Sequence, residues 1–183
     1  MKFCSQCGSD KLEEIVPEGD DHERIVCSSC KTIHYQNPIV VVGCIPASED
    51  KILLCRRAIQ PRYGKWTIPC GFMENGESVE HGAQRETWEE ARAKVDLHNV
   101  QLVYTVIHVN QVYIVFRSTL NPVKFEPGPE SLEVKLFDFD EIPWDEIAFS
   151  SVECALKAYI QDYRNDRFLT HCHSYRRLDH QAQ

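Results

Sequence analysis

The chain lacks any long hydrophobic run and any excess of positive charge. No segment approaches the roughly 18 uninterrupted apolar residues that a membrane span requires, and residues 1–7 lack the apolar core of a secretory signal peptide. Lysine and arginine number 20 against 28 aspartates and glutamates, which gives a formal charge of −8. An acidic surface disfavours non-specific binding to nucleic acid, because the phosphates need neutralising cations. We therefore expect a cytoplasmic protein with no membrane and no nucleic-acid partner.

Length and composition describe a globular chain with one main domain. The chain has 183 residues, of which 43% are hydrophobic and 26% are charged, and these shares are ordinary for a globular protein. This length suffices for one domain with a proper core and a small additional module.

Four of the nine cysteines form two Cys-x-x-Cys pairs, Cys4 with Cys7 and Cys27 with Cys30. This spacing is typical of a tetrahedral Zn²⁺ site with four thiolates. Disulfides or a chance pattern are the alternatives, and the odd cysteine total and the expected reducing compartment disfavour both. Four protein ligands leave no open position, so the zinc should be structural. Residues 1–35 should then form a small zinc ribbon that depends on its metal for stability.

The main domain, residues 37–164, shows alternating strand and helix signals. Apolar runs predict strands at residues 39–45, 51–57, 66–69, 101–109, 112–120 and 131–139. Helices are expected at residues 79–92, with Ser78 as the N-cap, and at residues 151–164. The stretch 165–183 is polar and irregular. Its His171-Cys172-His173 triplet carries metal-ligating side chains, but adjacent residues rarely converge on one ion, so we expect a poorly ordered polar tail.

Three glutamates stand at helical spacing in the expected helix 79–92. Glu86, Glu89 and Glu90 share one helix face, because each residue advances by about 100°. Like charges at this spacing repel, and a hard divalent cation such as Mg²⁺ or Mn²⁺ would reverse that cost. The pattern therefore predicts a divalent-metal site and indicates phosphate chemistry.

The segment around these glutamates resembles the Nudix box, G-x5-E-x7-R-E-U-x-E-E-x-G-U, in which U is a bulky aliphatic residue. The matching positions are Gly71, Glu77, Arg85, Glu86, Glu89 and Glu90. Six specified positions in one window exceed what chance would supply. The resemblance covers roughly residues 37 to 164. It implies an α/β fold, a Nudix α/β/α sandwich with a mixed sheet, preceded by the zinc-ribbon β module.

Three positions of the box depart from the family pattern. Thr87 and Ala93 stand where aliphatic residues are expected, and Arg92 replaces a glycine after the helix. These positions govern packing and helix termination. We therefore expect a less bulky contact between the helix and the sheet and a different C-terminal cap, with the carboxylates unaffected.

The resemblance also implies roles for the box residues. Glu86, Glu89 and Glu90 would hold Mg²⁺ or Mn²⁺ together with the carbonyl oxygen of Gly71, as in the family. Arg85 would orient a carboxylate through a salt bridge to Glu89, four residues further on. In the family, the glutamate that corresponds to Glu77 orients other groups and does not bind the metal directly. The metal would lower the pKa of a bound water, which attacks one phosphorus in line.

The sequence does not decide which residue is the general base. It must lie within hydrogen-bond reach of the attacking water. Glu86 can serve if it is not fully committed to the metal, whereas family members of the ADP-ribose type use a glutamate from a late loop. Glu130 and Glu133 are the candidates here, and each is read equally well as a solvated surface acid.

Candidate substrate contacts lie just before the box. Arg56 and Arg57, at the end of the strand 51–57, suit pairing with phosphates, and an exposed strand-end charge is the alternative. Tyr63 and Trp66 are candidates for stacking a base or flavin ring, and core packing is the alternative. Further aromatic candidates are Tyr35, Trp88, Tyr113 and Phe116.

Two branches of the family combine a zinc ribbon with a Nudix domain. These are NADH pyrophosphatases and plant-type FAD/ADP-ribose pyrophosphatases. The NADH branch carries a Ser-Gln-Pro-Trp-Pro-Phe-Pro-x-Ser run after the box, which this chain lacks, whereas residues 34–38, 59–61 and 85–91 resemble the FAD/ADP-ribose branch. We therefore expect hydrolysis of the pyrophosphate bond in a nucleoside diphosphate linked to another moiety, with FAD or ADP-ribose favoured.

Other functions remain as alternatives. An NADH pyrophosphatase and a clean-up hydrolase for oxidised nucleotides belong to the same class of enzyme. A non-catalytic regulator that senses nucleotides belongs to another class, but it would have lost box carboxylates and carry a basic partner domain. Here all box glutamates remain and residues 1–35 are acidic. The role of the ribbon stays open, and a homodimer is one possibility.

Overall fold

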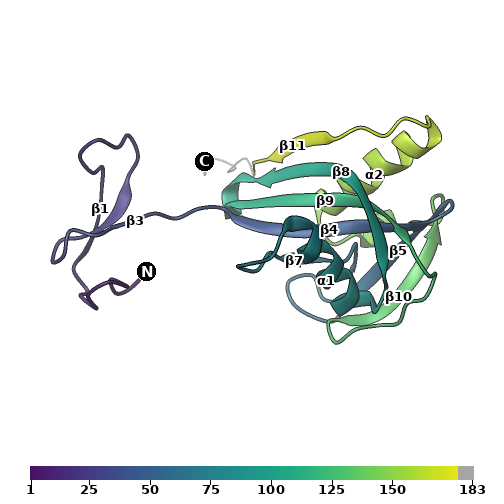
Figure 1. The fold of residues 1–183 in the computed structure, drawn as a ribbon, viewed down its shortest axis with the longest axis horizontal. Helices are drawn as coiled ribbons and strands as arrows, with labels where there is room; N and C mark the ends of the chain where they lie inside the picture. The colour runs from purple at the N-terminus through teal and green to yellow at the C-terminus, as the bar shows by residue number, and fades with distance from the viewer. Residues whose placement is uncertain (177–183) are drawn as a thin grey trace, which may run out of the picture. The chain divides into compact units, whose positions relative to one another are not determined.

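The computed structural model describes residues 1–176, so the end of the predicted polar tail lies outside the described residues. The chain divides into two units, Met1–Asn37 and Pro38–Gln183 (Figure 1). None of the helices in the described residues has the length and apolar character needed to cross a membrane.

The first unit is a three-stranded antiparallel sheet. Its strands are β1 (Leu12–Ile15), β2 (Arg24–Cys27) and β3 (Ile33–His34), in that order. Its buried side chains are Cys4, Val26, Cys27 and His34. Because these few side chains do not make an independent core, the unit needs another source of folding energy, as a metal-dependent ribbon would have.

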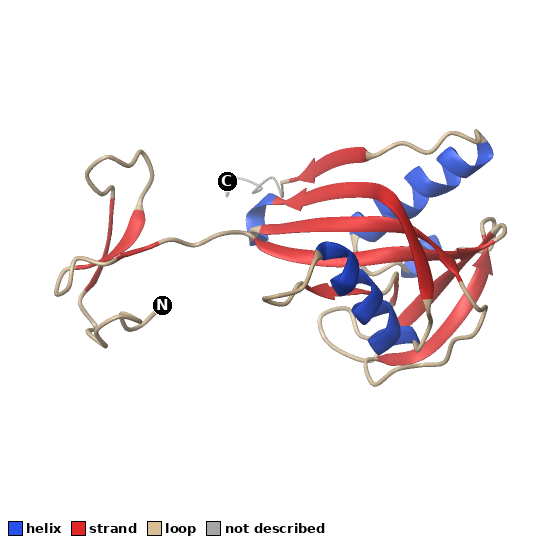
Figure 2. Ribbon diagram, in the orientation of Figure 1, coloured by secondary structure: helices blue, strands red, loops and turns tan. Residues whose placement is uncertain are grey.

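The second unit is built on an eight-stranded mixed sheet (Figure 2). The strands are β4 (Ile39–Ser48), β5 (Lys51–Arg57), β6 (Trp66–Thr67), β7 (Cys70–Phe72), β8 (Val95–Val106), β9 (Gln111–Leu120), β10 (Ser131–Asp138) and β11 (His171–Tyr175). Their order is β10-β5-β4-β9-β8-β11, with β6 beside β5 and β7 beside β4. The central strand β4 is parallel to β9 and antiparallel to β5 and β7.

Two helices cover opposite faces of this sheet. They are α1 (Val79–Ala91) and α2 (Ser150–Arg164), and Figure 2 shows α1 in front of the strands and α2 behind them. Alternating side chains of the central strand fill the two cores: Val42 and Cys44 pack on the α1 side, and Ile45 packs on the α2 side. The predicted α/β/α sandwich is therefore confirmed.

The helix α1 begins and ends as its sequence indicates. The hydroxyl of Ser78 accepts a hydrogen bond from the amide of His81, so Ser78 is the N-cap. Ala83, Thr87 and Ala91 form a stripe of small side chains on α1, and all three are fully buried against the sheet. At the C-terminus Arg92 adopts a left-handed conformation (φ 48°) and donates its amide to the carbonyl of Trp88. Arg92 thus takes the capping role of the family's glycine.

Several predicted strands have different bounds in the structure, and β4 continues to Ser48. The strand expected at residues 66–69 ends at Thr67 as β6, and Cys70–Phe72 form a separate strand, β7. The strand expected at residues 101–109 begins at Val95 and ends at Val106, where a 3-10 turn, η1 (Ile107–Val109), follows. Register shifts between Leu97 and Leu102 break the period-two pattern of β8, which hid its first half in the sequence. A second 3-10 turn, η2 (Trp144–Glu146), precedes α2.

The prediction of an irregular tail is wrong for residues 171–175. These residues form β11, which extends the sheet parallel to β8. Most of its side chains are exposed, so no apolar alternation marks the strand. A buried carboxylate on α2 anchors it instead. Asp162 accepts hydrogen bonds from Gln101 Nε2 (2.9 Å), the amide of Leu169 (3.1 Å) and His171 Nε2 (2.9 Å).

Replacing Asp162 should destabilise the second unit. Asp162 is 5% exposed, and Asp162→Ala would leave the Gln101 amide and the Leu169 N–H without an acceptor, which costs about 1–3 kcal/mol of unfolding free energy. Urea denaturation measures this loss. Asp140→Ala is the matched control, because it removes only the exposed ion pair with Arg164 and should cost about 0–1 kcal/mol. Equal losses in the two variants would contradict the anchoring role.

The stabilisation by Asp162 should also depend on pH. Burial raises the pKa of Asp162, but the hydrogen bonds from Gln101, His171 and Leu169 outweigh it, so the pKa lies below its usual value. A lowered pKa in the folded state means that the stabilisation is present above the unfolded value of about 4 and is lost as the pH falls below it. The difference between wild type and Asp162→Ala should therefore shrink in acid, and a constant difference from pH 7 to pH 2 would count against this cause.

Candidate active site and zinc site

The residues that match the box lie where α1 faces β7. Gly71 belongs to β7 and pairs with Val42 of β4. A Cβ atom at residue 71 would overlap the carboxylate of Glu86. Glycine at this position therefore lets the backbone of β7 approach the carboxylates of α1, which explains the first residue of the box.

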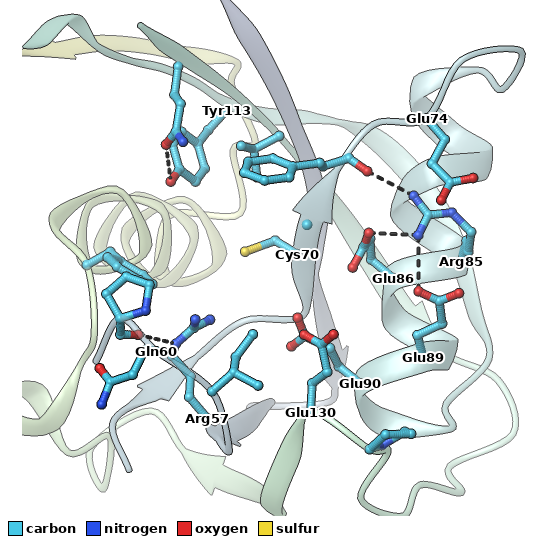
Figure 3. A pocket seen from close by; sticks show the side chains of 18 of the residues that line it. Arg57, Gln60, Cys70, Glu74, Arg85, Glu86, Glu89, Glu90, Tyr113 and Glu130 are labelled. Carbon is cyan, nitrogen blue, oxygen red and sulfur yellow. Dashed lines mark hydrogen bonds and ion pairs between the residues drawn. The ribbon is translucent and has the colours of Figure 1, made fainter. Parts of the chain in front are cut away.

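Arg85 links three carboxylates and one backbone carbonyl, and Figure 3 shows its bonds to Glu86 and Glu89. Its Nε and Nη2 donate to the two oxygens of Glu77, at 3.0 and 2.9 Å. Its Nη1 donates to Glu86 at 2.7 Å and to Glu89 at 3.1 Å, and Nη2 also donates to the carbonyl of Phe72 at 3.0 Å. All five N–H groups of the guanidinium are thereby used. The bonds to Glu77 and Glu86 raise the pKa of Arg85, so the group stays charged.

Glu77 is committed to holding Arg85. Besides the paired bonds from the guanidinium, it accepts the amide of Glu74 at 2.8 Å. The hydrogen bonds from Arg85, followed by the amide of Glu74, lower the pKa of Glu77 to about 2. This placement agrees with the orienting role that the family resemblance implies for Glu77.

Glu86 and Glu90 are buried carboxylates with too little positive charge around them. They are 9% and 6% exposed. Burial raises the pKa of Glu86 despite its bond to Arg85. Burial and the charge of Glu86 raise the pKa of Glu90 to about 8, and Glu90 makes no ion pair within residues 1–176. A hard divalent cation with oxygen ligands would remove this cost, so the donor set fits such an ion.

These carboxylates open into a cavity of 860 Å³, which is the size of a small-molecule site. Glu130 and Arg57 also line the cavity, and Figure 3 shows both on the same side of it as Glu90. Glu130 lies close enough to raise the pKa of both Glu86 and Glu90. The guanidinium of Arg57 lies 5.2 Å from the ring of Phe149 and donates to the carbonyl of Pro61 at 2.9 Å.

The candidate residues of the second unit that do not line this cavity are Arg56, Tyr63, Trp66, Trp88, Phe116 and Glu133. Arg56 donates to the carbonyl of Gly64 at 3.0 Å and pairs with Glu133 at 3.7 Å. Trp66 is a core residue that packs edge-on against Phe137. Tyr63 is exposed and does not line the cavity. The structure thus brings Arg57 and Glu130 to the carboxylates, but not Arg56, Tyr63, Trp66 or Glu133.

Several lining residues carried no clear signal in the sequence. Phe72 and Glu74 occupy unspecified positions of the box, so their place in the cavity could have been inferred from their neighbours. Gln60 and Phe149 come from loops far from the box, and only the fold brings them together.

Two further groups in the cavity, a thiol and a phenol, stay protonated. Burial raises the pKa of the Cys70 thiol far above its usual value, so Cys70 stays protonated. Burial also raises the pKa of Tyr113 to about 12. The hydroxyl of Tyr113 donates to Gln111 at 3.0 Å, which leaves it as a polar contact rather than a proton acceptor.

The four cysteines of the first unit converge. Their Sγ atoms all lie within 4.8 Å of one another, with 3.6 Å between Cys4 and Cys30 and 3.7 Å between Cys7 and Cys27. Tetrahedral zinc with bonds of about 2.3 Å requires sulfur atoms about 3.8 Å apart. Hydrogen bonds from Thr32 lower the pKa of Cys30 to about 6, which favours the thiolate. These residues fit a structural zinc ion.

Comparison with known proteins accounts for both sites. The NUDIX domain family matches residues 37–153. The chain belongs to the Nudix family. The Nudix N-terminal family matches residues 2–36, the segment that carries the four cysteines. The box glutamates and the convergent cysteines are therefore parts of a two-module Nudix protein.

Individual Nudix proteins are also similar to this chain. The crystal structure of a NUDIX hydrolase from Nitrosomonas europaea is 50% identical, with a TM-score of 0.91 over 96% of this chain and 99% of that one. The ADP-ribose pyrophosphatase of Methanocaldococcus jannaschii is 31% identical over 133 residues, 69% of this chain and 76% of that protein. The NAD-capped RNA hydrolase NudC of Vibrio atlanticus is 32% identical over 107 residues, which cover 55% of this chain. The alignments with the first two curated relatives cover 21% and 35% of the length of those proteins.

Removing zinc should unfold the first unit alone. With Cys27→Ser, or after chelation, amide hydrogen exchange should accelerate in residues 1–37 and stay unchanged in residues 38–176, because the hydrophobic cores of the second unit contain no residue of the first. Cys172→Ser, which removes an exposed thiol on β11, is the control. Elemental analysis should find one zinc per chain in freshly purified protein, and its absence would refute the zinc assignment.

Proposed function

We propose that this Nudix protein hydrolyses the pyrophosphate bond of a nucleoside diphosphate linked to another moiety, with FAD or ADP-ribose as the preferred substrate. In this proposal residues 37–164 form the catalytic domain and residues 1–35 the zinc ribbon. Glu86, Glu89, Glu90 and the carbonyl of Gly71 hold Mg²⁺ or Mn²⁺.

The observation that carries this proposal is the buried pair Glu86 and Glu90 at the wall of an 860 Å³ cavity. Two buried carboxylates, of which only Glu86 bonds to an arginine, would repel a free diphosphate. The same pair with a divalent cation attracts it, so the site is suited to phosphates only in its metal-bound form. A cavity of this volume also accommodates a nucleotide.

The residues of the site have different roles in the reaction. When bound, the cation polarises the diphosphate and lowers the pKa of a water molecule. Arg85 holds Glu86 and Glu89 in fixed positions, so little reorganisation is needed when substrate arrives. Arg57 pairs with phosphate oxygens, and Glu130 accepts the proton of the attacking water at its carboxylate.

The choice of substrate rests on the branch of the family. The Methanocaldococcus jannaschii relative is named an ADP-ribose pyrophosphatase, and alignment with it covers most of both chains. The Vibrio atlanticus relative is named an NAD-capped RNA hydrolase, which supports NAD-type substrates as the second candidate. The run of residues that marks the NADH branch is missing after the box, so we favour FAD or ADP-ribose.

A substrate panel with Mg²⁺ tests this choice. FAD, ADP-ribose, NADH, diadenosine polyphosphates and oxidised dGTP are compared by kcat/KM, with analysis of the two phosphorylated products. We expect the highest values with FAD or ADP-ribose and no turnover when the divalent cation is removed. A strong preference for NADH would overturn the specificity.

Glu90→Gln tests the role of the carboxylates in the same assay. It keeps the shape of the side chain but removes the charge that the cation needs, so kcat should fall by at least about 100-fold. Activity that survives this substitution would overturn the proposed mechanism. Circular dichroism checks that the variant is folded.

Glu130→Gln tests the assignment of the general base. Loss of a positioned base typically lowers the rate by about 10²- to 10⁴-fold, and KM should change little because the metal-holding carboxylates remain. Glu133→Gln is the matched control, because Glu133 pairs with Arg56 outside the cavity, and it should keep a rate close to wild type. If Glu133→Gln loses the rate and Glu130→Gln does not, the assignment is wrong.

A further inference from the structure

A second cavity of 670 Å³ lies at the C-terminal end of α1. It is lined by Trp88, Arg92, Lys94 and residues 122–126, and we call it the basic groove. Arg92 also lines the catalytic cavity. The two cavities therefore adjoin at Arg92.

The segment between β9 and β10 ties the two cavities together. Its Glu126 and Gly128 donate their amides to the carbonyls of Ala91 and Glu90, at 2.9 and 3.0 Å. A Cβ atom at residue 128 would overlap the carbonyl of Glu89, so only glycine allows this close approach. The segment is thus bonded to the end of α1. It places residues 122–126 in the basic groove and Glu130 in the catalytic cavity.

The basic groove is positive on an acidic protein. It contains Arg92, Lys94 and Lys124 against Glu126, a local charge of 3 − 1 = +2 in a chain with a net charge of −8. None of the three cations makes an ion pair with another residue in the range 1–176. Their proximity to the C-terminus of α1 accounts for Arg92 and Lys94, because a helix dipole favours cations there. It does not account for Lys124, which comes from another segment.

The basic groove also presents an aromatic face. Trp88 is 46% exposed, an unusual position for a tryptophan. The guanidinium of Arg92 lies 5.7 Å from the centre of its ring. Aromatic rings beside cations are the elements that bind a nucleotide, since the base stacks on the ring and the phosphate pairs with the cations.

We propose that the basic groove binds a nucleotide unit of the substrate that carries a phosphate beyond the scissile diphosphate. This inference rests on the proposed function, because it places the diphosphate in the catalytic cavity. The base stacks on Trp88, and the additional phosphate pairs with Lys94 and Lys124. Two sources share this chemistry, a phosphorylated dinucleotide-type small molecule and the first nucleotides of an oligonucleotide joined through its 5′ diphosphate.

Paired substrates test the proposal. ADP-ribose is compared with ADP-ribose 2′-phosphate. Adenosine joined through a 5′–5′ diphosphate to one adenosine is compared with adenosine joined in the same way to a trinucleotide. We expect kcat/KM to rise by about tenfold with the additional phosphate in at least one pair. The pair that responds identifies the source of the ligand.

Lys124→Glu is the diagnostic variant and Lys157→Glu the matched control. Both make the same charge change, but Lys157 lies on α2 and pairs with Glu153 outside the basic groove. Lys124→Glu should abolish the preference for the phosphorylated member of the pair and leave the rate with ADP-ribose unchanged, whereas Lys157→Glu should keep the preference. Equal kcat/KM within both pairs in wild type, or equal losses in the two variants, would overturn the proposal.

A binding measurement separates this inference from the proposed function. The probe is a trinucleotide 5′-monophosphate, which has no diphosphate to hydrolyse, and binding is followed by tryptophan fluorescence in wild type and in Trp88→Phe. Quenching that is lost in Trp88→Phe and weakened in Lys124→Glu supports the basic groove even if every substrate in the panel fails. The proposal is wrong if the probe does not bind. It is also wrong if Lys124→Glu dissociates an oligomer of the protein but leaves binding of the probe unchanged.

Discussion

The catalytic half of the molecule is organised around the repulsion between the acidic side chains of α1. Four N–H groups of Arg85 hold Glu77, Glu86 and Glu89 in place, which satisfies the acids that face Arg85. Glu90 is left as a buried carboxylate with a raised pKa and no ion-pair partner in the described part of the chain. The folded protein therefore carries an electrostatic cost that one divalent cation removes. Metal dependence follows from this arrangement of charges rather than from any single ligand.

The position of these carboxylates also determines how closely α1 and the sheet must pack. Carboxylates reach the wall of the cavity only if β7 and α1 lie close together, and glycine at residue 71 permits that. On the adjoining part of α1 that packs on the sheet, Ala83, Thr87 and Ala91 are fully buried. The hydroxyl of Thr87 donates back to the carbonyl of Ala83 at 2.7 Å, so a polar residue is satisfied where the family has an aliphatic one. The departures from the family pattern are thus local solutions to the same packing problem.

Sequence reasoning succeeded where spacing alone defines a site. The glutamates share a helix face and the cysteine pairs form a tetrahedron, and both relations follow from short-range geometry. It failed where the fold selects among neighbours. Arg56 and Arg57 point to opposite faces of β5, and nothing in the sequence shows which one faces the cavity. The strand β11 was missed because Asp162, distant in the sequence from Gln101, anchors it by hydrogen bonds instead of apolar packing.

The C-terminal end of α1 separates two electrostatic environments that require different partners. On one side lie carboxylates that accept a phosphate only through a cation. On the other lie Arg92, Lys94 and Lys124, whose side chains can pair with a phosphate directly. Because the segment between β9 and β10 is bonded to the end of α1, these environments are held in a fixed relation. A substrate with phosphates at both positions would satisfy both, and a diphosphate alone would use only the first. In the proposed binding mode, specificity beyond the scissile bond therefore depends on Arg92, Lys94 and Lys124 rather than on the box glutamates.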